Sequence, residues 1–237
     1  MLDWLDGVFR GLGLTSAALL GHSYGGWLAL SYAGHAAPGR VNRLVLLDPT
    51  QCFAGFRPSY LLRALPLFVR PGERSTRRFL EWETGGAPPA PELVRLMGLG
   101  AVEFRTAKVV TGPRPDVTRA VPTLLLLAGR SRTHDPRRVA ARAERALAGV
   151  RIATLAGVTH HSLPYADPEA LGRQVLGFLP AGLPGGTPLT AARRSGRPAV
   201  SPPRPARWPP RPPPYGPPPR PRSARRPASP RVPRPGP

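Results

Sequence analysis

Ser23 is the residue whose surroundings most strongly suggest chemistry. It stands between Gly21 and Gly25, three residues after the end of the apolar run 16–20 and before a segment with helical spacing. A tight turn from a strand into a helix strains the serine backbone and exposes its hydroxyl, and small flanking residues let the chain fold back. The pattern predicts a nucleophile elbow at Ser23. The alternative is an ordinary serine in a glycine-rich turn.

A nucleophilic serine needs a histidine to take its proton and a carboxylate to hold that histidine in the correct tautomer. His160 is the candidate base because it follows the predicted strand 150–155 after a short turn, and this position favours it over His161. The other histidines are interpreted as flanking the elbow, lying on a helix surface and lying in a loop: His22, His35 and His134.

Predicted strands and helices alternate around these residues. Apolar runs predict strands over 16–20, 43–49, 121–129 and 150–155. Helical spacing predicts helices over 2–12 and 27–36, and Asp-Pro pairs at 135–136 and 167–168 mark the starts of two more. Strands that alternate with helices predict an α/β fold around a parallel sheet.

With the elbow, these strands and the turn that carries His160, residues 1–180 resemble the α/β-hydrolase family. The resemblance implies a mostly parallel sheet with core segments over 1–50 and 121–180 and a helical lid over 51–120. It implies hydrolysis of a small carboxylic ester or related acyl substrate through an acyl-serine intermediate, without a metal or organic cofactor. The backbone N–H of Tyr24 is the expected oxyanion donor.

Two carboxylates compete for the acid position of the triad. In the family the acid usually follows the strand that ends here at Gly129, and Asp135 is the first carboxylate after it. Asp135 also precedes Pro136, which suits a helix N-cap, and both roles are compatible. Asp48 follows the preceding strand and is the alternative. We therefore expect a triad of Ser23, Asp135 and His160.

The sequence begins close to the elbow. The predicted helix 2–12 resembles the one that precedes the nucleophile strand in the family, so the family's first strands have no counterpart, and neither does the loop with its second oxyanion donor. We interpret the chain as N-terminally truncated, which predicts an unpaired sheet edge. A weak or inactive hydrolase-like fragment is therefore an alternative function.

Residues 181–237 differ in composition from the rest of the chain. They contain 20 of the 35 prolines, 12 of the 34 basic residues and no acidic residue. Without hydrophobic periodicity they bury too little apolar surface to offset the entropy of ordering, so we expect a disordered tail. A second alternative is thus an interaction protein that works through this Arg/Pro-rich tail, with a partner that the sequence does not identify.

Composition also argues against several classes of protein. The net charge of +21 comes without a recognition motif, so we expect no binding of nucleic acid. Cys52 is the only cysteine, which excludes an internal disulfide framework. Asp3 and Asp6 stand where a secretory signal is basic, and no apolar run is long enough to span a membrane. These features predict a cytoplasmic location.

Overall fold

The computed structural model describes residues 1–103, 114–117 and 121–180. The predicted tail over 181–237 and part of the predicted lid lie outside these described residues. The chain divides into two compact units, and the first, Met1–Gly185, holds all of the described residues.

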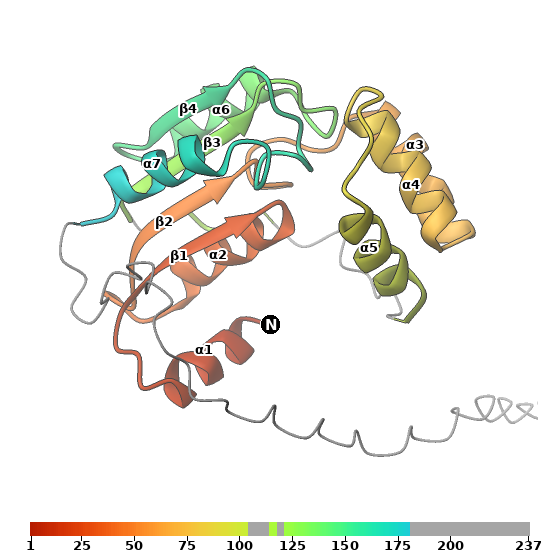
Figure 1. The fold of residues 1–237 in the computed structure, drawn as a ribbon. Helices are drawn as coiled ribbons and strands as arrows, with labels where there is room; N and C mark the ends of the chain where they lie inside the picture. Colours follow the sequence, from red (N-terminus) through yellow and green to blue (C-terminus); the bar gives the residue numbers. More distant parts are fainter. Residues whose placement is uncertain (104–113, 118–120, 181–237) are drawn as a thin grey trace, which may run out of the picture. The chain divides into compact units, whose positions relative to one another are not determined.

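The described residues form a four-stranded parallel sheet (Figure 1). Its strands pair in chain order: β1 (Ala17–His22), β2 (Val41–Leu47), β3 (Thr123–Ala128) and β4 (Arg151–Leu155). β3 is buried along its whole length, as expected of a parallel strand covered on both faces. The predicted α/β architecture is confirmed. Because the strands are parallel, their carboxyl ends meet at one edge of the sheet, and the loops that follow them converge there.

Helices cover both faces of this sheet. α1 (Leu2–Gly11), α2 (Tyr24–His35) and α6 (Pro136–Ala146) contribute to one apolar core, and α7 (Pro168–Phe178) packs against the other. Alternate side chains of β2 enter the two cores, Leu44 and Leu46 on one face and Val45 and Leu47 on the other. Apolar packing on both faces of the sheet therefore holds the strands, and with them the turns at their ends.

In the described part of the chain, three helices lie between β2 and β3. They are α3 (Pro58–Val69), α4 (Glu73–Glu83) and α5 (Pro91–Glu103), and Figure 1 shows them beyond the carboxyl ends of the strands. They share a small buried cluster of Ala64, Phe79, Leu80 and Val94. Large apolar side chains stay exposed on α3 and α5, among them Leu62 and Leu96 at 70% each. The described part of the insertion consists mainly of these helices, and its role as a lid stays a prediction.

Within the described residues, no helix combines the length and the apolar character needed to cross a membrane.

Candidate active site

Ser23 lies on the turn between β1 and α2 in a conformation that side chains rarely adopt, with φ at 56° and ψ at −120°. The turn is fixed on both sides of the serine. The Ser23 N–H donates to the Leu47 carbonyl at 3.0 Å, and the Thr50 N–H donates to the Ser23 carbonyl at 3.2 Å. The end of β2 therefore holds the serine in its strained position.

Two glycines allow this turn to close. A Cβ on Gly21 would overlap the Gly25 carbonyl, and a Cβ on Gly26 would lie 2.8 Å from the Cβ of Pro49. A Cβ on Gly25 would meet nothing within 4 Å. The sequence pattern led us to expect the steric demand at Gly21 and Gly25. The structure places it at Gly21 and Gly26, because the position of a Gly25 side chain is open space.

Replacing Gly21 by alanine is therefore expected to destabilise the protein by about 1–3 kcal/mol, as for other insertions into a filled site, and to lower turnover by distorting the elbow. The matched control is Gly25→Ala, which lies in the first turn of α2 and is expected to be neutral or stabilising by about 0.5–1 kcal/mol. Thermal unfolding of both variants measures the difference. Equal melting temperatures for the two would contradict the packing described for Gly21.

The structure brings Ser23 and His160 together, and the carboxylate beside them is Asp48. Ser23 Oγ lies 2.9 Å from Nε2 of His160, and His160 Nδ1 lies 2.7 Å from Oδ2 of Asp48. The serine follows β1, the aspartate follows β2 and the histidine follows β4. Asp48 and His160 are buried, whereas Ser23 is only partly buried at the edge where the strands end.

Asp135, the expected acid, does not approach His160, and this pairing is corrected to Asp48. Asp135 is exposed at the N-terminus of α6, where Oδ1 accepts hydrogen bonds from the backbone N–H groups of Arg137 and Arg138. The first amides of a helix lack partners within the helix, so a preceding aspartate satisfies them. Helix capping therefore accounts for the position of Asp135.

Asp48 is a buried carboxylate surrounded by donors. Oδ1 accepts from the Ala128 N–H at 3.1 Å and from His134 Nε2 at 3.0 Å, while Oδ2 accepts from Ser131 Oγ at 3.0 Å and from His160. Burial alone would raise the pKa of the Asp48 carboxyl, but the hydrogen bonds from His134 and His160 and the electrostatic interaction with both rings outweigh it and hold that pKa well below its usual range. Asp48 is therefore ionised at neutral pH.

The His160 ring is unprotonated at neutral pH, the state in which an imidazole can accept a proton. Burial lowers its pKa below the usual value, and the hydrogen bond to Asp48 only partly opposes this effect. Because the carboxylate accepts the Nδ1–H, the lone pair of Nε2 faces the Ser23 hydroxyl. The ring is thus set to receive the serine proton.

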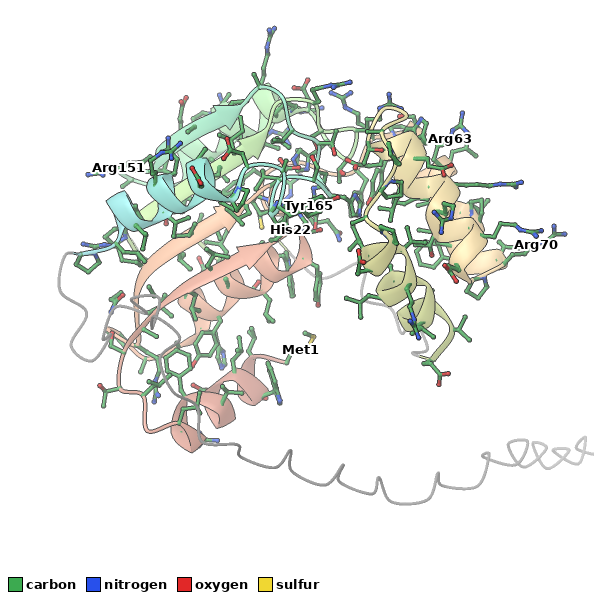
Figure 2. All side chains as sticks on the ribbon, in the orientation of Figure 1. Met1, His22, Arg63, Arg70, Arg151 and Tyr165 are labelled. Carbon is green, nitrogen blue, oxygen red and sulfur yellow. The ribbon has the colours of Figure 1, made fainter. Side chains whose placement is uncertain are left out.

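His22 hydrogen-bonds the backbone of the loop that carries His160, rather than Ser23. It is labelled in Figure 2 near the carboxyl end of β1, and its Nε2 lies 2.8 Å from the His160 carbonyl, to which it donates. Burial lowers the pKa of His22 to about 4, so the ring is neutral. The sequence interpretation as a residue that flanks the elbow did not foresee this contact.

Glu83 joins the site from the insertion and was not predicted from the sequence. It ends α4, is fully buried, and its Oε2 accepts from the Thr159 hydroxyl at 2.9 Å and lies 3.4 Å from His161 Nδ1. Burial would raise the pKa of Glu83, but the neighbouring His161 ring and the hydrogen bond from the Thr159 hydroxyl lower it overall. A glutamate in a polar helix resembles a surface residue, so no local signal identifies it. His161 thus pairs with the insertion and not with Ser23.

Tyr24 is the first residue of α2, so its backbone N–H belongs to the helix turn whose amides have no partner within the helix. Its ring stacks on Trp27 with centroids 5.1 Å apart. The Tyr24 amide directly follows Ser23 in the chain, and its role as an oxyanion donor stays a prediction.

A hollow of about 1090 Å³ between α3 and α4 is separate from this site. Leu62, Leu65 and Val69 line it together with arginines, including Arg63 and Arg70, which Figure 2 labels on the insertion. Ser23, Asp48 and His160 are not among its lining residues. The hollow therefore does not identify where an acyl group would bind.

The chain is similar in sequence and fold to a bacterial carboxylesterase. The chain is 28% identical over 192 residues to the carboxylesterase YbfK of Bacillus subtilis (strain 168). This alignment covers 76% of the chain and 63% of that relative. The chain thus spans less than two thirds of the length of this relative. The crystal structure of that carboxylesterase, also called CesB, superposes with a TM-score of 0.64 at 25% identity, covering 77% of this chain and 66% of the other.

A more distant structure shares the fold alone. The meta-cleavage product hydrolase of Pseudomonas fluorescens IP01 superposes with a TM-score of 0.60 at 16% identity, covering 75% of this chain and 69% of the other. The model of the alpha/beta hydrolase family matches residues 2–174, which include the elbow, the insertion and the loop that carries His160. From its sheet, its elbow and this match, the chain belongs to the alpha/beta hydrolase family.

Proposed function

We propose that the chain hydrolyses a carboxylic ester or related acyl compound with Ser23 as nucleophile, His160 as general base and Asp48 as the orienting carboxylate. The observation that carries this proposal is the continuous path of hydrogen bonds from Ser23 Oγ through His160 to Asp48, held on a strained turn. Backbone strain at a serine beside a neutral histidine is typical of a functional site rather than of a structural turn.

Acylation begins when Ser23 Oγ attacks the carbonyl carbon of the ester and His160 Nε2 takes the hydroxyl proton. His160 then returns this proton to the leaving alcohol as the ester C–O bond breaks, and the acyl group remains on Ser23. Water attacks the acyl-serine with His160 again as base, which releases the acid and restores the serine hydroxyl. Asp48 stays ionised and stabilises the imidazolium that forms in each half of the reaction.

The negative charge on the carbonyl oxygen requires donors that are already aimed at it. The Tyr24 backbone N–H, adjacent to the nucleophile, is our proposed donor, because the residue after the serine of an elbow supplies this group. Removal of one oxyanion donor costs about 10²–10³-fold in rate, so this amide matters for activity.

The substrate class follows from the chemistry and from the relatives. An acyl-serine mechanism suits carboxylic esters, and the named relative from Bacillus subtilis is a carboxylesterase. The weaker alternatives, an inactive hydrolase-like chain and an interaction protein that works through residues 181–237, leave the strained serine and its paired histidine without an explanation.

Hydrolysis of p-nitrophenyl acetate by the full chain tests the proposal, with p-nitrophenyl phosphate as the control substrate. Release of p-nitrophenol from the acetate, well above the rate in buffer, is the expected result, because the site is arranged for acyl transfer. Cleavage of the phosphate alone, or no release above buffer from either compound, would refute the proposed reaction.

A further inference from the structure

His134 occupies an unexpected place in the site. It lies between β3 and α6, one residue before the helix cap Asp135, and was interpreted from the sequence as a loop residue. The structure buries its side chain to 1% exposure and places Nε2 3.0 Å from Oδ1 of Asp48. A carboxylate oxygen only accepts, so His134 Nε2 carries a hydrogen and donates it.

The contact from His134 completes the hydrogen bonding of Asp48. An ionised carboxylate has roughly four acceptor positions, and four donors of the described residues fill them: two on Oδ1, from Ala128 and His134, and two on Oδ2, from Ser131 and His160. With both oxygens held, the carboxylate cannot rotate away, and Oδ2 stays directed at His160 Nδ1. Of the two donors to Oδ1, His134 is the side chain and Ala128 is a backbone amide.

His134 also competes with His160 for the same negative charge. The two rings are 6.2 Å apart between centroids and nearly perpendicular, at 81°, with one on each oxygen of Asp48. A hydrogen bond donated to one oxygen draws electron density from the carboxylate and weakens its attraction for the other donor. Loss of this donor would therefore strengthen the hold of Asp48 on the His160 proton.

We propose that His134 is a positioning residue that fixes the Asp48 carboxylate and moderates its pull on the His160 proton. This inference rests on the proposed function, since it concerns the same serine, histidine and aspartate. Among the described residues His134 makes no hydrogen bond to Ser23 or to His160; its side-chain hydrogen bond goes to Asp48, and its ring lies edge-on to that of His160.

Other titratable groups face His160, and the test variants must leave these residues unchanged. His22 ends β1, Asp48 follows β2, and His134 lies in the loop before α6. His161 is the next residue in the chain, and Glu83 of α4 lies beyond it. Burial lowers the pKa of His160, the hydrogen bond to Asp48 raises it, and electrostatic interactions with the His161 and His134 rings lower it further. Removal of His134 therefore shifts the pKa of His160 upward.

Two variants separate positioning from packing. His134→Leu keeps an apolar group of similar size but has no donor, whereas His134→Gln keeps an N–H donor near the position of Nε2. Nitrogen-15 NMR of histidine-labelled protein reports the tautomer of His134 and the titration of His160, and hydrolysis of p-nitrophenyl acetate reports kcat/KM against pH. Thermal unfolding shows whether each variant is folded.

In the wild-type protein, Nε2 of His134 should carry hydrogen. In His134→Leu, the titration of His160 and the acidic limb of kcat/KM should both move to higher pH, with kcat/KM about 10–100-fold lower, as expected for loss of a hydrogen bond to a charged group. His134→Gln should recover most of this loss. A purely structural role would lower the melting temperature without moving the titration.

A wild-type His134 that carries hydrogen on Nδ1 and none on Nε2 would overturn the inference even if no variant folds. So would a folded His134→Leu protein in which His160 titrates as in the wild type. Because the titration requires no turnover, a chain without esterase activity would refute the proposed function and still decide the role of His134.

Discussion

Replacing Asp48 by asparagine is expected to lower kcat for ester hydrolysis by about 10⁴-fold, the size of the effect that this exchange has in a serine–histidine–aspartate triad. The asparagine amide offers one oxygen and one NH₂ group, whereas His134 and His160 both donate to Asp48. One of the two histidines must then lose its acceptor or change tautomer. Steady-state hydrolysis of p-nitrophenyl acetate measures the loss.

The matched control is Asp135→Asn. Asparagine is as good a helix cap as aspartate, so the start of α6 and the stability of the protein should be unchanged. Since Asp135 makes no contact with His160 in the structure, kcat should stay close to that of the wild type. A large loss with Asp135→Asn and a small one with Asp48→Asn would reverse our assignment of the acid.

Replacing Ser23 by alanine is expected to have the largest effect of all, a loss of about 10⁶-fold in kcat, because no nucleophile remains to form the acyl intermediate. His160→Ala should cause a loss of the same order, since the two residues act as a unit. Ser31→Ala is the control on the adjacent helix α2, where a buried hydroxyl has no hydrogen-bond partner in the described residues. Turnover by Ser31→Ala should match the wild type.

The fold was largely predictable because its signals are local. The apolar runs at β2 and β3 and the Asp-Pro starts of α6 and α7 are each contained in a few consecutive residues. The elbow was predictable for the same reason, since the turn that strains Ser23 depends on Gly21 two residues before it. The C-terminal tail lies outside the described residues, and its disorder stays a prediction.

The acid was less predictable because it depends on side-chain direction at the ends of two neighbouring strands. Asp48 and Asp135 both follow strands that pair directly, β2 and β3, so both belong to the same edge of the sheet. What separates them is the left-handed backbone of Asp48, with φ at 41°, and the helix that begins after Asp135. Only the second of these has a signal in the sequence.

Contacts between distant segments account for the rest of what was missed. Glu83 reaches Thr159 and His161 from a helix of the insertion, and His134 reaches Asp48 from a loop. Each of these residues, read with its neighbours in the sequence, resembles a surface or loop residue. Their positions follow from how the insertion and the loops pack at the carboxyl end of the sheet, which no local pattern encodes.

Labelling with a fluorophosphonate probe, followed by mass spectrometry of the digested protein, tests the central assignment most directly. The probe reacts with a serine only when a neighbouring base activates it, and it forms a stable phosphonyl-serine. We expect one label per chain on the peptide that contains Ser23, and no labelling of Ser23→Ala or His160→Ala. A label on another serine, or unchanged labelling of a folded Ser23→Ala protein, would contradict Ser23 as the nucleophile.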